Sequence, residues 1–233
     1  MLKTVSVQES GQKLSLESVL IGYQDTEKAT GDENPGKYSL GLALRVYDVL
    51  QEMADTNSSG NIKRVGTSIA IGYRPEHYKQ ARPMDTDYFE TRRCSIYDSD
   101  IADHIIRSTR YDGGIVIDIH GNIIRAGVKF VADDGEVLDE MDIPNEKSLS
   151  ERFGYNEKVG SRHTSCSAVS YKMPDTLIFI LSEEKNKIRV LRRGYIINSQ
   201  HTEEIVACSE EDTTHHFPAS STLPANENRV DAA

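Results

Sequence analysis

Five short runs of β-branched and large apolar residues, separated by amphipathic stretches, are the feature that most constrains the fold of this chain. Each run is typical of a strand. Apolar residues at helical spacing follow Ser39 and again Asp98, which are suitable helix caps, and a third helix is expected near Arg162. Strands that alternate with helices and also form hairpins predict an α/β domain with a central mixed sheet flanked by helices. The five runs are residues 65–72, 115–119, 123–131, 177–181 and 188–191.

Composition divides the chain into three parts. Residues 39–200 contain all the predicted strands and form one domain. Residues 1–38 are an N-terminal extension whose role the sequence does not indicate, and the polar residues 208–233 are expected to be a disordered tail. Three charged stretches predict loops or surface excursions, the second with at most a short helix: residues 24–38, 73–93 and 132–159.

The net charge of −10 restricts the partners of the protein. An acidic chain has no general attraction to nucleic acids or anionic membranes, so we expect neither as a partner. No apolar run of about 18 residues predicts a transmembrane helix, and the start of the chain has no secretory pattern. The three cysteines match neither a zinc site nor a disulfide framework. These features predict a cytoplasmic protein.

Asp112-Gly113-Gly114 lies where a predicted helix turns into the strand at 115–119. An Asp-Gly pair taken alone is much more often a turn in which the carboxylate accepts hydrogen bonds from nearby amides. The functional interpretation makes Asp112 a metal ligand. The two residues without side chains would then leave room for a phosphate.

Gly160-Ser161-Arg162-His163-Thr164 predicts a helix start that can bind a phosphate. The first amides of a helix and its positive dipole end face outward. Gly160 permits close approach, Ser161 can cap and donate, and Arg162 and His163 add charge-assisted donors. An ordinary capped helix with exposed Arg and His explains this segment equally well. No Walker loop occurs in the chain.

Ser182-Glu183-Glu184 follows an apolar strand, at a strand end where open α/β sheets place ligands. Such glutamate pairs are usually solvated turn residues. Cys166 follows His163 by three residues, which permits a Cys–His nucleophile, but a small buried cysteine is the better interpretation.

Together, in order and context, these three motifs resemble those of the diadenylate cyclase domain, the nucleotide-binding domain of DNA-integrity scanning proteins. The resemblance covers roughly residues 40–195. The family pattern is Asp-Gly-Ala at a strand start, Gly-Thr/Ser-Arg-His-Arg at a helix start, and a Ser-Glu-Glu hairpin. The resemblance implies a mixed sheet of seven strands flanked by helices.

The resemblance also implies an activity, the condensation of two ATP molecules to cyclic di-AMP and pyrophosphate across a face-to-face homodimer. Mn²⁺ or Mg²⁺ would be required. By position, Asp112, Arg162 and His163 would be catalytic, and Asp112 and Glu183 would hold the metal. The nucleotide-binding residues would be Gly113, Gly114, Gly160, Ser161, Arg162, His163, Thr164 and Ser182.

Three positions depart from the family pattern. Gly114 replaces an alanine, Thr164 replaces the second arginine, and Tyr111 stands where many members have histidine. Losing one Arg–phosphate contact costs about 1.5–3 kcal/mol, which slows an enzyme without abolishing it. Because the residues assigned to catalysis remain, we expect an active enzyme. The alternatives are a catalytically silent nucleotide or cyclic-dinucleotide sensor and a scaffold without a ligand.

Overall fold

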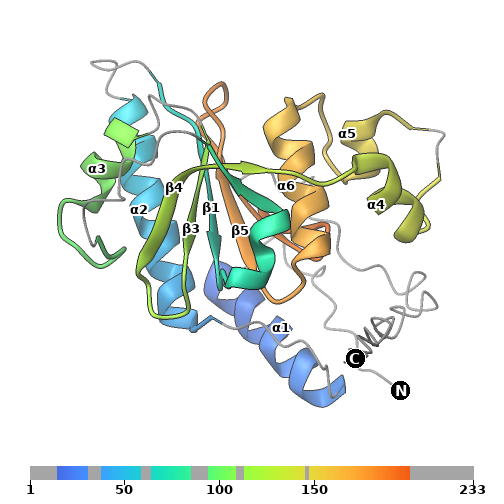
Figure 1. The fold of residues 1–233 in the computed structure, drawn as a ribbon, viewed down its shortest axis with the longest axis horizontal. Helices are drawn as coiled ribbons and strands as arrows, with labels where there is room; N and C mark the ends of the chain where they lie inside the picture. Colours follow the sequence, from blue (N-terminus) through green and yellow to red (C-terminus); the bar gives the residue numbers. More distant parts are fainter. Residues whose placement is uncertain are drawn as a thin grey trace, which may run out of the picture.

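The computed structural model describes residues 15–30, 38–58, 64–84, 94–108, 113–144 and 147–199. These residues form a central sheet with helices on both faces (Figure 1). The strands are β1 Thr67–Ile71, β2 Ala81–Pro83, β3 Gly114–Ile117, β4 Ile123–Phe130, β5 Leu177–Leu181, β6 Ile188–Arg192 and β7 Tyr195–Ser199. The helices are α1 Leu16–Thr30, α2 Leu40–Ser58, α3 Ile101–Ser108, α4 Asp134–Glu140, α5 Leu149–Arg152 and α6 Ser161–Lys172, with a 3₁₀ helix η1 at Pro75–Lys79.

The sheet has seven strands in the order β2-β4-β3-β1-β5-β6-β7 within the described residues. β1 and β3 are parallel, with Ile69 opposite Ile115, and all the other neighbouring strands are antiparallel. The sheet is therefore mixed, as the alternation of strands, hairpins and helices predicted.

Two hydrophobic cores lie on the two faces of the sheet. Figure 1 shows α2 and α3 on one side and α4, α5 and α6 on the other. Along β1, Ile69 and Ile71 belong to the first core and Ala70 to the second, because successive side chains of a strand point to opposite faces. Because β1 is buried on both faces, its sequence is a run of β-branched and small residues without any charge, which is why this strand was predictable.

Helix α2 forms where the spacing predicted it. The Ser39 hydroxyl accepts a hydrogen bond from the Leu42 amide at 3.0 Å, so Ser39 caps the helix as expected. Asp98 does not cap α3. This helix begins at Ile101, and the Asp98 carboxylate accepts a hydrogen bond from the Ser95 amide at 2.8 Å.

Other elements correct the predicted loops. Helix α1 runs to Thr30, so the prediction of a loop from residue 24 is wrong there, and Leu16 and Leu20 anchor this helix in the core. Within 73–93, η1 is the expected short helix, but β2 was not predicted and forms because it pairs with β4. The excursion at 132–159 contains α4 and α5, whose caps are Asp133 and Ser148. Both were missed because two such short helices show little periodicity.

The predicted tail at 208–233 lies outside the described residues. No helix among the described residues is long and apolar enough to cross a membrane.

Candidate functional site

A hollow of about 490 Å³ lies where β1 and β3 begin, β5 ends and α6 starts. Its volume falls within the range of about 300–1,000 Å³ that is usual for small-molecule sites. Three segments that are far apart in the sequence meet here. The predicted site residues that line the hollow are Gly113, Gly114, Gly160, Ser161, Arg162, His163, Ser182 and Glu183.

Of the predicted site residues that the structure describes, one does not line the hollow. Thr164 is 4% exposed, and its hydroxyl donates to the Ser161 carbonyl at 3.2 Å. Asp112 lies outside the described residues, as does Tyr111, although Asp112 directly precedes Gly113 in the chain.

The position of the hollow on the sheet is only partly the expected one. Ser182 and Glu183 follow the carboxyl end of β5, where ligands of open α/β sheets usually bind. The same edge holds the amino ends of β1 and β3, because β5 is antiparallel to β1. This arrangement places the strand-starting glycines and the Ser-Glu-Glu turn at one site.

The start of α6 is open towards solvent. Gly160 is the residue before the first helical turn, and no side chain accepts a capping hydrogen bond from the helix start. The sequence prediction that Ser161 caps the helix is therefore wrong. A Cβ at Gly160 would contact nothing within 4 Å. A phosphate can therefore approach the backbone of the first turn, where helix amides and the dipole favour an anion.

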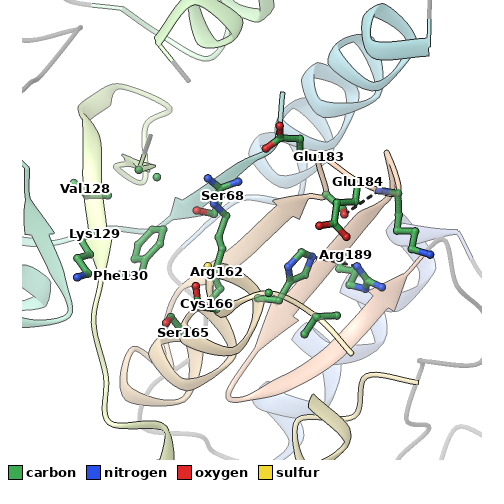
Figure 2. A pocket seen from close by; sticks show the side chains of 18 of the residues that line it. Ser68, Val128, Lys129, Phe130, Arg162, Ser165, Cys166, Glu183, Glu184 and Arg189 are labelled. Carbon is green, nitrogen blue, oxygen red and sulfur yellow. Dashed lines mark hydrogen bonds between the residues drawn. The ribbon is translucent and has the colours of Figure 1, made fainter. Parts of the chain in front are cut away.

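Positive charge is concentrated in the hollow although the chain carries a net charge of −10. Among the lining residues, five cations face three carboxylates. Figure 2 shows Arg162 extending from α6 towards Ser68 on β1, while Glu183 and Glu184 come from the turn after β5. An anionic ligand is therefore attracted locally. The cations are Lys129, Lys158, Arg162, Lys185 and Arg189, and the carboxylates are Glu157, Glu183 and Glu184.

Arg189 on β6 is a site residue that the sequence analysis missed. It is only 1% exposed, and its guanidinium lies 3.2 Å from Nε2 of His163 and 3.3 Å from Oε1 of Glu157. The Tyr155 ring lies beneath the guanidinium at 5.4 Å. A signal was present in the sequence, because an arginine inside a buried apolar strand requires polar partners.

The two strand-starting glycines lie against β4 and its neighbours. A Cβ at Gly114 would lie 2.4 Å from Cε2 of Phe130 and 2.9 Å from Oγ of Ser68. At Gly113, where φ is +96°, a Cβ would lie 3.0 Å from Cα of Gly127. The glycines therefore permit close packing of β3 behind the hollow, in addition to leaving it open.

Cys166 is fully buried beneath the hollow. Burial raises the pKa of its thiol to about 12, although the Ser68 hydrogen bond and the Arg162 charge act in the opposite direction. The thiol is protonated at neutral pH and is not a nucleophile. The buried small cysteine was the interpretation that the sequence favoured.

A divalent metal fits the donor chemistry of this site. No group of three or more His, Cys, Asp or Glu side chains that could hold a metal gathers within the part of the chain that the structure describes. Glu183 is exposed and lines the hollow, and Glu184 lies beside it. Mg²⁺ and similar cations commonly use one or two carboxylates together with substrate phosphates, which is what these residues offer.

Comparisons with known proteins show distant similarity. No family model matches the chain, and the search of curated proteins found no match. A hypothetical membrane spanning protein from Bacillus cereus is 15% identical, with 67% of this chain and 63% of that chain covered and a TM-score of 0.43. The chain thus spans less than two thirds of that protein. A double mutant of DacA from Staphylococcus aureus is 19% identical, with coverages of 71% and 89% and a TM-score of 0.38.

Proposed function

We propose that this chain is a diadenylate cyclase, which binds ATP in the hollow and condenses two ATP molecules to cyclic di-AMP and pyrophosphate. The observation that supports the proposal is the meeting of three segments in one cationic hollow: Gly113-Gly114, residues 160–163 and residues 182–184. The resemblance to the diadenylate cyclase family rests on these segments, together with Asp112. Their order in the sequence does not by itself require them to be neighbours.

Each part of the hollow has a role in this reaction. The open start of α6 and the Arg162 guanidinium would bind the phosphates, and the hydroxyl of Ser161 adds a donor. The 3′-hydroxyl of each ATP attacks the α-phosphate of the other, so that two phosphodiester bonds form and two pyrophosphates leave. Phosphoryl transfer depends mainly on positioning and on neutralising charge, which these groups supply.

Mn²⁺ or Mg²⁺, when bound, would supply further charge neutralisation at the phosphates. Asp112 and Glu183 would hold it, together with the phosphate oxygens. Because the reaction joins two nucleotides and each hollow would hold one, the proposal requires two protomers to face each other as a homodimer.

One observation favours a second candidate, a catalytically silent nucleotide or cyclic-dinucleotide sensor. Thr164 takes the place of the second arginine of the family pattern, and it is buried and bonded to the Ser161 carbonyl. It therefore adds no cation to the phosphate site. A site with one cation fewer still binds an anion, but it stabilises the developing charge of the transition state less.

Incubation of the purified protein with ATP and Mn²⁺, with Mg²⁺ in parallel, and chromatography of the nucleotides tests the proposal. We expect cyclic di-AMP from the parent protein and none from Arg162→Ala or Asp112→Asn. Arg107→Ala is the matched control, because Arg107 is an exposed arginine on α3 that is not among the residues lining the hollow. It should leave turnover unchanged.

The outcomes separate the candidates. No product, combined with a rise in melting temperature on adding ATP, supports the sensor, because a ligand that binds only the folded state stabilises it. No product and no thermal shift contradict both candidates. Turnover of Asp112→Asn at the parent rate excludes the role proposed for Asp112.

A further inference from the structure

Arg189 determines the environment of one nitrogen of the His163 ring. The Nη1 atom of Arg189 lies 3.2 Å from Nε2 of His163, within hydrogen-bond distance. A guanidinium has five N–H donors, no acceptor, and remains charged in proteins. The only hydrogen bond possible between these atoms has Arg189 as the donor, so Nε2 of His163 must accept it with its lone pair.

An imidazole whose Nε2 accepts a hydrogen bond is neutral and carries its proton on Nδ1. Protonation of Nε2 would break this hydrogen bond and bring two cations to 3.2 Å in a site where Arg189 is 1% exposed. Both effects disfavour the imidazolium.

Other contacts hold Arg189 and the His163 backbone in place. Glu157 bonds Nη2 of Arg189 through Oε1 at 3.3 Å, and its second oxygen lies 3.4 Å from Nζ of Lys185. The Tyr155 hydroxyl donates to the His163 carbonyl at 3.0 Å, while its ring meets the imidazole edge at a centroid distance of 5.7 Å. This leaves the guanidinium little freedom to turn away from Nε2.

The charged and titratable groups around the ring come from every neighbouring element. They are Tyr155 and Glu157 before α6, Arg162 on α6, Lys185 in the turn after β5, and Arg189 on β6. The Glu157 carboxylate bonds to Arg189 and Lys185, and Glu183 and Glu184 also line the hollow. The cations of the hollow still outnumber these carboxylates, so the surroundings as a whole do not favour a second cation next to Arg189.

We propose that Arg189 is a positioning residue that holds His163 as a neutral imidazole with its proton on Nδ1. His163 then acts in the hollow as a neutral N–H donor, and the cationic charge towards phosphates comes from Arg162 and the lysines. This consequence for phosphate binding rests on the proposed function, whereas the protonation state itself does not.

His77 provides an internal reference with the opposite arrangement. Its Nδ1 atom accepts a hydrogen bond from the Arg74 amide at 3.2 Å, and Nε2 lies 3.1 Å from Oδ1 of the buried Asp175. An amide can only donate here, so the proton of His77 is on Nε2. One protein thus holds two histidines that differ in which nitrogen is protonated.

Nuclear magnetic resonance of the nucleotide-free, ¹⁵N-labelled full chain measures these states directly. Two-bond ¹H–¹⁵N correlation spectra distinguish the two neutral tautomers and the imidazolium. Spectra of His163→Asn and His77→Asn assign the signals. We expect His163 to remain in the Nδ1–H form between about pH 7 and 8, where a free histidine is mostly neutral but tautomerises, and the His77 signals to show the opposite tautomer.

Arg189→Met removes the donor with little change in side-chain volume. We expect the protonation midpoint of His163 to rise by about one pH unit, because the nearby cation is lost while Glu157 remains. Tyr155→Phe is the matched control, since it removes a hydrogen bond to the same residue through its backbone carbonyl only. It should leave the His163 tautomer unchanged.

A parent spectrum with the His163 proton on Nε2, or with both nitrogens protonated at neutral pH, overturns the inference. An unchanged midpoint in Arg189→Met, or an equal shift in Tyr155→Phe, also overturns it. If Arg189→Met does not fold, the parent spectrum still decides. Glu157→Gln then serves as the second variant, because it keeps Arg189 and should keep the Nδ1–H form. Since no nucleotide is present, failure here is distinct from failure of the cyclase assay.

Discussion

Replacing Gly114 by alanine tests how β3 fits against β4 behind the hollow. The added methyl group would lie 2.4 Å from Cε2 of Phe130 and 2.9 Å from Oγ of Ser68. Favourable carbon–carbon contacts are about 3.5–4.0 Å, so the ring would have to move by roughly 1 Å. Phe130 is buried in the second core and cannot move without disturbing its neighbours.

The expected cost follows from this geometry. Overpacking a filled core costs about 1–3 kcal/mol in the free energy of unfolding. For a chain of this length a loss of about 2 kcal/mol lowers the melting temperature by about 4–8 °C. Phe130→Leu removes the ring atom that collides, so the double variant Gly114→Ala/Phe130→Leu should be more stable than the sum of the two single changes by about 1–2 kcal/mol.

Urea denaturation of the four members of this cycle, followed by circular dichroism, measures the coupling. Gly41→Ala is the control, because a Cβ at this exposed position of α2 would contact nothing within 4 Å. It should stabilise the protein by up to about 1 kcal/mol. The reasoning is refuted if Gly114→Ala is as stable as the parent, or if Phe130→Leu leaves the penalty unchanged.

Two further changes have clear expected results. Gly160→Ala should leave the free energy of unfolding within about 0.5 kcal/mol of the parent, because the poorer cap is offset by a less flexible unfolded chain. The same change should weaken ATP binding about tenfold, and unchanged affinity by titration calorimetry would argue against a phosphate at this backbone.

Burial raises the pKa of Asp175, but the His77 hydrogen bond and the charge of Arg74 act in the opposite direction and hold the pKa below its usual value. This carboxylate therefore stabilises the fold above the unfolded pKa of about 3.9, and the contribution is lost as the pH falls through the lower folded pKa. Asp175→Asn should lower the free energy of unfolding by about 2 kcal/mol at pH 7. This is less than for a fully buried ion pair, because Arg74 is partly exposed. Urea denaturation should show the difference between the variant and the parent shrinking below about pH 4. A constant difference at every pH would contradict this.

Local pattern alone was enough to predict much of the fold. In the strand at 67–71, Ile69, Ala70 and Ile71 are apolar and face the two cores. Helix α2 carries both its apolar spacing and its Ser39 cap in one stretch of sequence. The hairpin of β5 and β6 was predicted in the same way. Such signals depend on neighbouring residues, so no knowledge of distant contacts was needed.

Elements that exist through distant contacts were not predictable. α1 is weakly amphipathic, and it is anchored by Leu16 and Leu20 in a core built mainly from other elements. β2 has three residues and depends on its pairing with β4. Short segments of this kind carry too little periodicity of their own to be recognised.

The sequence by itself determined which residues of the hollow are chemically suited to phosphates, and it placed them in three separate motifs. Only the tertiary structure decided that eight of the predicted residues share one hollow, because this depends on β5 entering the sheet antiparallel to β1. It also turned Thr164 away from the hollow and brought Arg189 to His163 across 26 residues of chain. Residue type and local spacing are written along the chain, whereas the direction of a strand within a sheet is set by packing between distant segments.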